Sequence, residues 1–100
     1  MDIKNDYQVI IPAFIRFDDR LPIGARMLYG DLIELSKDTG YCIAKDSDLM
    51  ELYHVSNSTI ESWLRYLDQY GYIIRETMHI KQMRVRKIYI TNRFAGIPQT

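Results

Sequence analysis

The fold of this chain is decided by residues 47–67, which have the sequence SDLMELYHVSNSTIESWLRYL. Two apolar stripes at helical spacing run through this stretch, and a short polar turn separates them. Ser56 is a good N-cap because its hydroxyl can accept a hydrogen bond from a free N–H of the first helical turn. The spacing therefore predicts a helix at about 45–53, a tight turn, and a longer helix that follows Ser56 and ends near Tyr70.

These two predicted helices form a helix-turn-helix. The shorter helix is expected to pack across the longer one through an apolar set: Leu49, Leu52, Val55, Ile60, Leu64 and Leu67. This packing leaves the first turns of the longer helix free to enter a DNA major groove. Two positions depart from the usual pattern. Met50 stands where a small residue is common, and His54 stands where glycine is common, so His54 needs a left-handed backbone conformation.

The preceding segment predicts an arm and a first helix. Residues 7–17 are rich in β-branched and aromatic side chains, and we expect an extended arm with a short strand before Pro12. Pro22 suits the first turn of a helix, apolar residues then recur at helical spacing, and Gly40 terminates the helix. The apolar run at 41–43 predicts a further short strand.

The C-terminal segment changes to a period of two. This alternation predicts strands at Tyr72–Met78 and Val85–Thr91, joined by residues 79–84. The full order is helix, short strand, helix, turn, helix, hairpin, which is a winged helix-turn-helix: an α+β fold of three helices plus a C-terminal β-hairpin wing. We assign residues 1–93 to this domain and residues 94–100 to a tail or the start of a linker.

The distribution of charge favours a polyanionic partner, although the formal net charge is zero. Residues 1–70 contain seven Lys or Arg against twelve Asp or Glu, whereas residues 71–100 contain six against one. The C-terminal third thus has a net charge of +5 and can present a positive patch to nucleic acid. A hairpin that simply carries its solvated cations outward would show the same distribution.

The candidate DNA contacts lie on the longer helix and on the wing. From the helix we predict contacts by Asn57, Ser58, Thr59, Glu61, Ser62 and Arg65. From the wing, at or near its tip, we predict contacts by Lys81, Arg84, Arg86 and Lys87. Short polar side chains let the helix approach base edges, with Arg65 the strongest expected contact. Glu61 repels phosphate, but it can accept a hydrogen bond from a cytosine amino group. Four to six phosphate contacts predict a log–log salt slope of about −4 to −5.

Other classes of function lack their sequence signals. The chain has no run of about 18 apolar residues and no signal peptide, and its single cysteine cannot form an internal disulfide; these features predict a cytoplasmic protein that does not contact membranes. Cys42, His54 and His79 lack metal-site spacing, and the glycines form no phosphate-binding loop. We therefore expect no enzyme activity, no metal and no cofactor.

An ordered set of short segments resembles a known family. The segments are Ile11-Pro12, the run ARMLYG at 25–30, Gly40-Tyr41-Cys42, Val55-Ser56, Thr59-Ile60, Trp63-Leu64, Gly71-Tyr72-Ile73 and the run RKIYI at 86–90. In these segments the chain is similar, over about residues 7–92, to the N-terminal winged-helix domain of phage and plasmid replication initiators and replisome organisers of Gram-positive mobile elements.

The resemblance implies binding of double-stranded DNA at a replication origin, often as a homodimer on repeated sites. It also implies replication proteins as partners, recruited by a separate C-terminal domain. No such domain lies in these 100 residues, so we expect either a fragment of a longer initiator or a short protein with another task. An aromatic set also favours a dimer: Tyr7, Phe14, Tyr29 and Tyr66.

Two alternatives to origin recognition stay open from the sequence. A transcriptional regulator of the same fold would bind an operator that overlaps a promoter. A winged helix used for protein interaction would not bind DNA at all, and charge reversal at Lys81 and Arg84 would then disrupt a protein complex and leave DNA affinity unchanged.

Overall fold

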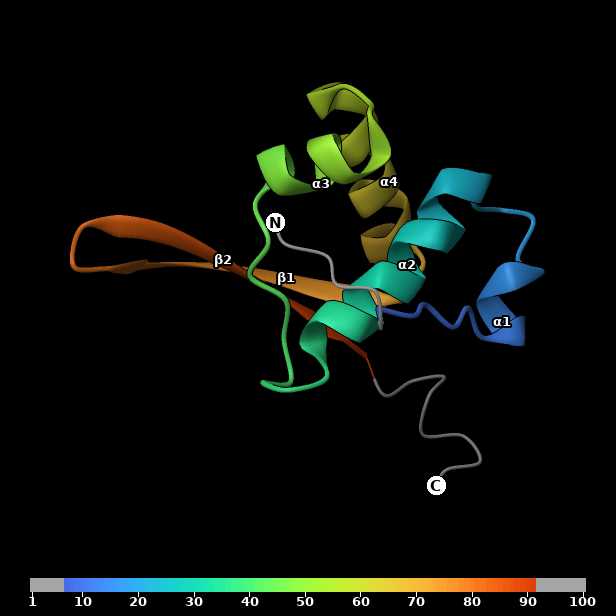
Figure 1. Ribbon diagram of the computed structural model, residues 1–100, viewed down its shortest axis with the longest axis horizontal. Helices are drawn as coiled ribbons and strands as arrows, with labels where there is room; N and C mark the ends of the chain where they lie inside the picture. Colours follow the sequence, from blue (N-terminus) through green and yellow to red (C-terminus); the bar gives the residue numbers. More distant parts are fainter. Residues whose placement is uncertain (1–6, 92–100) are drawn as a thin grey trace.

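The computed structural model describes residues 7–91 and shows helices gathered over the root of a hairpin that extends away from them (Figure 1). The elements in order are α1 (Ala13–Arg16), α2 (Ile23–Ser36), α3 (Asp46–Tyr53), α4 (Asn57–Gln69), β1 (Ile73–Ile80) and β2 (Met83–Ile90). Helices followed by an antiparallel two-stranded hairpin make an α+β winged helix, as predicted. The domain boundary expected at residue 93 lies outside the described residues.

The arm differs from its prediction. No strand is formed by residues 7–12, and the chain turns into α1 directly after Pro12. The reason is local, because the Pro12 carbonyl accepts the N–H groups of Ile15 and Arg16 at 3.2 and 2.9 Å. The expected strand before Pro12 and the extended path to residue 17 are therefore wrong. The short helix places Ile15 in the core with no exposed surface.

The arm is held against α2 by a close approach and a buried carboxylate. A methyl group at Gly30 would lie 2.6 Å from Cγ1 of Val9, so only glycine allows the arm to pass this close to α2. The Tyr7 hydroxyl donates to Asp31 Oδ1 at 2.6 Å, and the Tyr53 hydroxyl of α3 donates to Oδ2. Burial and the adjacent carboxylate raise the pKa of both phenols. Asp31 therefore joins the arm, α2 and α3.

One hydrophobic core lies between the helices and the wing root. Its buried members include Ala25, Leu28, Tyr29, Leu32, Leu49, Ile60, Leu64, Leu67, Ile73 and Ile88. The rings of Tyr29 and Tyr72 meet edge to face at 5.6 Å, and the ring of Phe14 stacks on Tyr72. The aromatic set that favoured a dimer is thus not one exposed surface, because Tyr29 is buried and Tyr7 is bonded to Asp31.

The wing is longer and its turn tighter than predicted. β1 and β2 pair from Ile73↔Ile90 to Ile80↔Met83, so a turn of two residues replaces the expected six-residue connection. Lys81 and Gln82 both have positive φ, 51° and 67°, as a type I′ turn requires. The short strand expected at 41–43 is present as a single bridge, in which Cys42 pairs with Ile88.

Candidate nucleic-acid interface

The helix-turn-helix geometry depends on the tight turn between α3 and α4, which is fixed by His54 and Ser56. His54 adopts the left-handed conformation, with φ 56°, as the sequence required for a tight turn at this position. Ser56 caps α4, because its Oγ accepts the N–H of Thr59 at 3.3 Å. Both predictions are confirmed, and α3 and α4 begin and end within one residue of the expected positions.

The inner face of α4 fixes which residues point outward. Ile60, Leu64 and Leu67 have no exposed surface, and Trp63 packs partly buried against Tyr53 of α3 with ring centres 5.3 Å apart. With 100° per residue, the opposite side of the helix carries an outer stripe: Ser58, Ser62, Arg65 and Gln69. Three of these four were predicted. Gln69 is not among the predicted contacts, because it lies in the last turn of the helix, where the sequence signals only the helix end.

The first turn of α4 holds a cluster of hydroxyl groups. Ser58 Oγ and Thr59 Oγ1 each lie 3.0 Å from Ser56 Oγ, and Asn57 is exposed beside them. Thr59 is half-buried and shares the cap hydrogen bonds, so its hydroxyl is less available to a ligand than that of Ser58. The N-terminal end of α4 therefore presents Asn57 and Ser58.

The carboxylates of α4 are neutralised by a residue that sequence analysis did not single out. Arg75 of β1 donates to Glu61 at 3.2 Å and to Asp68 at 3.1 Å. Glu61 and Asp68 are seven residues apart and so share one side of the helix, which is the only local signal for this arrangement. Because the guanidinium occupies Glu61, the expected repulsion between this carboxylate and phosphate is reduced.

The four wing cations fall into two pairs with different surroundings. Lys81 lies in the turn and Arg84 beside it, and both are exposed. Arg86 and Lys87 lie halfway along the hairpin, so the cluster expected at or near the tip is confirmed only for Lys81 and Arg84. Arg86 bonds Asp46 of α3 at 2.6 Å and the Ala44 carbonyl at 2.8 Å.

Lys87 is also engaged within the chain. Its ammonium lies 4.3 Å from the centre of the Tyr41 ring, a cation–π contact. Within residues 7–91, by contrast, Arg65, Lys81 and Arg84 of the predicted contacts form no ion pair. Among the predicted contacts, these three cations are the ones not engaged within the described chain. One comes from the outer stripe of α4 and two from the wing tip, which we define as residues 79–84.

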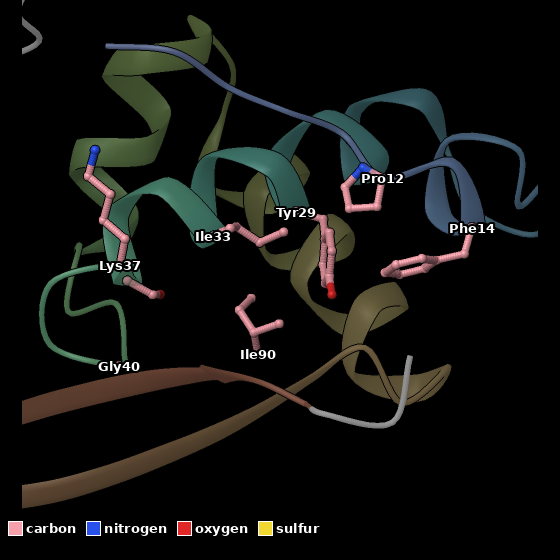
Figure 2. Close-up of a pocket in the computed structure, with 8 residues that line it drawn as sticks. Pro12, Phe14, Tyr29, Ile33, Lys37, Gly40 and Ile90 are labelled. Carbon is pink, nitrogen blue, oxygen red and sulfur yellow. The ribbon is translucent and has the colours of Figure 1, made fainter. Parts of the chain in front are cut away.

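An apolar recess of the surface lies away from this interface. Figure 2 shows it between the arm, α1, α2 and the end of β2, where Phe14, Tyr29, Ile33 and Ile90 surround an apolar space of about 470 Å³. None of the predicted contact residues lines it. Across residues 7–91 no cluster of three potential metal ligands occurs, and no helix has the length and apolarity to cross a membrane.

Comparison with known protein families identifies the class of this domain. A family model described as a helix-turn-helix domain matches residues 19–73, more than half of the chain. The chain belongs to this family. The match covers α2, α3 and α4 and ends at the first residue of β1, so most of the wing lies beyond it. No curated protein and no solved structure gives a significant match to this helix-turn-helix domain. Domains of this class bind DNA with the second helix of the motif, here α4.

Proposed function

We propose that this helix-turn-helix domain recognises a specific double-stranded DNA site, with α4 in the major groove and the wing tip on the flanking backbone, and that it acts by binding alone, without covalent chemistry. The observation that carries the proposal is the outer stripe of α4. It combines two serines with Arg65 on a helix whose carboxylates are already paired with Arg75. Serine and arginine side chains at this spacing can contact base edges and phosphates.

The wing contributes the part of the affinity that does not depend on sequence. Lys81 and Arg84 are free cations on long side chains, and each neutralised phosphate releases condensed counterions. Arg65, Lys81 and Arg84 give three phosphate or base contacts, fewer than the four to six expected from sequence, because Arg86 and Lys87 are engaged within the chain. The salt slope expected from cations alone is therefore about −3.

The biological role that we propose is recognition of a replication origin on a phage or plasmid. Its support is the resemblance to the winged-helix domains of replication initiators and replisome organisers. This resemblance implies a homodimer on repeated sites and recruitment of replication proteins. Repeated sites within the gene for this protein would support this role. A single palindrome that overlaps a promoter would favour a transcriptional regulator instead.

Fluorescence anisotropy tests the proposal. A duplex from the protein's own locus and a scrambled duplex are titrated across a salt series with wild type, Arg65→Ala and Lys81→Ala. We expect tighter binding to the native duplex, loss of discrimination with Arg65→Ala, and a salt slope shallower by about 1 with Lys81→Ala.

The matched control is Arg16→Ala, which also removes one exposed cation. Arg16 lies on α1, at the opposite end of the molecule from the wing tip (Figure 1). We expect this variant to bind both duplexes like wild type. Absence of binding to either duplex at low salt would overturn the proposal, and equal losses for Arg16→Ala and Arg65→Ala would overturn the assigned surface.

A further inference from the structure

The apolar recess beside α2 has the size of a small-molecule site. Its walls come from the arm and α1, from α2, and from the last residue of β2, and they include Phe14, Ile33 and Ile90 (Figure 2). Its volume of about 470 Å³ lies within the range of about 300 to 1,000 Å³ that is usual for ligand pockets in proteins. A molecule built on one aromatic ring is therefore small enough to enter it.

One buried polar group at this recess has no partner among residues 7–91, the hydroxyl of Tyr29. Only 1% of the Tyr29 surface is exposed, and Figure 2 shows the hydroxyl end of its ring between Phe14 and Ile90. The neighbouring buried phenol, Tyr72, donates to Asp18 at 2.6 Å, whereas the Tyr29 hydroxyl forms no hydrogen bond within the described chain. A buried donor without an acceptor is unfavourable, so an acceptor that reaches this hydroxyl gains a hydrogen bond.

The other polar side chains that line the recess are already engaged. Ser36 Oγ donates to the Leu32 carbonyl at 2.6 Å, and Lys37 is paired with Glu34 at 2.5 Å. In Figure 2 the Lys37 ammonium points away from the Tyr29 hydroxyl. This lining favours a neutral molecule with one acceptor over a carboxylate or a phosphate, because a charged group would lose its hydration there without an ion pair in return.

We infer that this recess is a binding site for a small neutral aromatic molecule that carries a hydrogen-bond acceptor, such as a carbonyl oxygen, and that the Tyr29 hydroxyl donates to that acceptor. The rings of Phe14 and Tyr29 meet edge to face at 6.2 Å, so an aromatic ligand beside them gains ring contacts in addition to burial. The site is separate from the proposed DNA recognition, because none of the predicted DNA contacts lines it. Ligand binding can therefore be tested without DNA.

Two probes that differ only at a carbonyl group test the inference. Acetophenone carries the carbonyl, and ethylbenzene has a methylene group in its place. Each probe is titrated into the full chain while NMR records the methyl resonances of Ile33 and Ile90. We expect both probes to shift these resonances in wild type. Tyr29→Phe removes the hydroxyl alone, so we expect it to weaken acetophenone binding about fivefold and to leave ethylbenzene binding unchanged.

Two variants serve as controls. Tyr72→Phe removes the hydroxyl of the neighbouring buried tyrosine, which does not line the recess, and should bind both probes like wild type. Ile33→Trp places a larger side chain in the recess and should weaken both probes. Thermal melting by circular dichroism confirms that each variant is folded. We expect Tyr29→Phe to melt at or above the temperature of wild type, because no hydrogen bond within the described chain is lost.

Three kinds of result would overturn the inference. If neither probe shifts the two resonances in wild type, or if Tyr29→Phe changes the affinity for both probes equally, the hydroxyl selects no acceptor in this recess. A lower melting temperature of Tyr29→Phe would mean that the hydroxyl already has a partner in the chain. Binding of the probes to Phe94→Ser and not to wild type would assign the recess to residues 92–100, in which Phe94 is the first apolar residue.

Discussion

The two parts of this molecule that we assign to DNA, α4 and the wing tip, differ in how the rest of the chain holds them. α4 is anchored along its whole length by three fully buried side chains and by Arg75, which binds both of its carboxylates. The wing is anchored at its root by Ile73 and Ile88 and at its middle by Arg86, and beyond that point nothing is buried. A rigid helix suits discrimination between bases, whereas a lightly held tip suits adaptation to a backbone.

We expect the largest difference between the helical layer and the wing tip in their response to high pH. Burial raises the pKa of Tyr29 to about 12, and burial with the hydrogen bond to Asp18 raises the pKa of Tyr72 to about 12. A raised folded-state pKa means that the stabilisation is complete below the unfolded value near 10 and is lost as pH rises toward 12. We expect the helical layer to unfold in this window, whereas the wing tip, residues 79–84, contains no tyrosine.

The measurement follows tyrosinate absorbance and helical circular dichroism across the same alkaline titration. The two signals should change together, because the buried phenols ionise only when the helices open. Ionisation of all the tyrosines near pH 10 with the helices intact would contradict the burial of Tyr29 and Tyr72.

Truncation of a side chain should have the next largest difference in effect on stability between α4 and the wing tip. Leu64→Ala removes a fully buried side chain from α4 and should lower the free energy of unfolding by about 3 kcal/mol. Met83→Ala truncates a side chain that is 64% exposed, and should change stability by less than about 0.5 kcal/mol. Urea unfolding of both variants checks the pair, and equal losses would mean that the tip is buried in solution.

A smaller effect is expected where α2 meets α4. A methyl group at Gly24 would lie 2.0 Å from Cζ2 of Trp63, a rigid ring that itself packs on Tyr53. Gly24→Ala should therefore destabilise the domain by about 2 kcal/mol, as overpacking does. Gly40→Ala is the matched control for space, because nothing lies within 4 Å of a methyl group there. Its cost is backbone strain alone, at φ 88°.

If α2 positions α4, Gly24→Ala should also reduce discrimination between native and scrambled duplexes, and the folded Gly40→Ala variant should not. Anisotropy titration of both variants, carried out well below their melting temperatures, checks this point. Retained discrimination in Gly24→Ala would show that the ring rotates away without moving α4.

The same contrast explains how much of the structure the sequence could predict. α2, α3 and α4 follow from helical spacing, the Ser56 cap, and the glycines Gly40 and Gly71 that follow α2 and α4, all of which are local signals. The pairing of Arg75 with Glu61 and Asp68, and of Arg86 with Asp46, depends on how the hairpin docks on the helices, so no local pattern reveals it. Two predicted wing contacts were therefore assigned as free cations when one is an ion-pair partner and the other packs on a ring.

The predictions for the arm and for the wing turn are wrong for a different reason, because the local sequence signals there are ambiguous. The β-branched residues before Pro12 favour a strand, but a strand also needs a pairing partner, and neither of the two described strands pairs with the arm. Lys81-Gln82 lacks the Asn or Gly that usually marks a two-residue turn, so the predicted strands stopped too early.

The turn at Lys81 and Gln82 carries backbone strain that a single substitution can relieve. Lys81 and Gln82 hold left-handed conformations that favour glycine, and each costs about 1 kcal/mol. Gln82→Gly should therefore stabilise the domain, by about 0.5 kcal/mol, because the more flexible unfolded chain offsets part of the relief. Thermal melting measures the gain, and a loss of stability would show that the Gln82 side chain has a structural contact. If long side chains at the tip serve DNA binding and not folding, Gln82→Gly will make the protein more stable and leave its affinity for duplex DNA lower or unchanged. On α4, by contrast, a substitution that weakens folding, such as Leu64→Ala, should weaken DNA recognition as well.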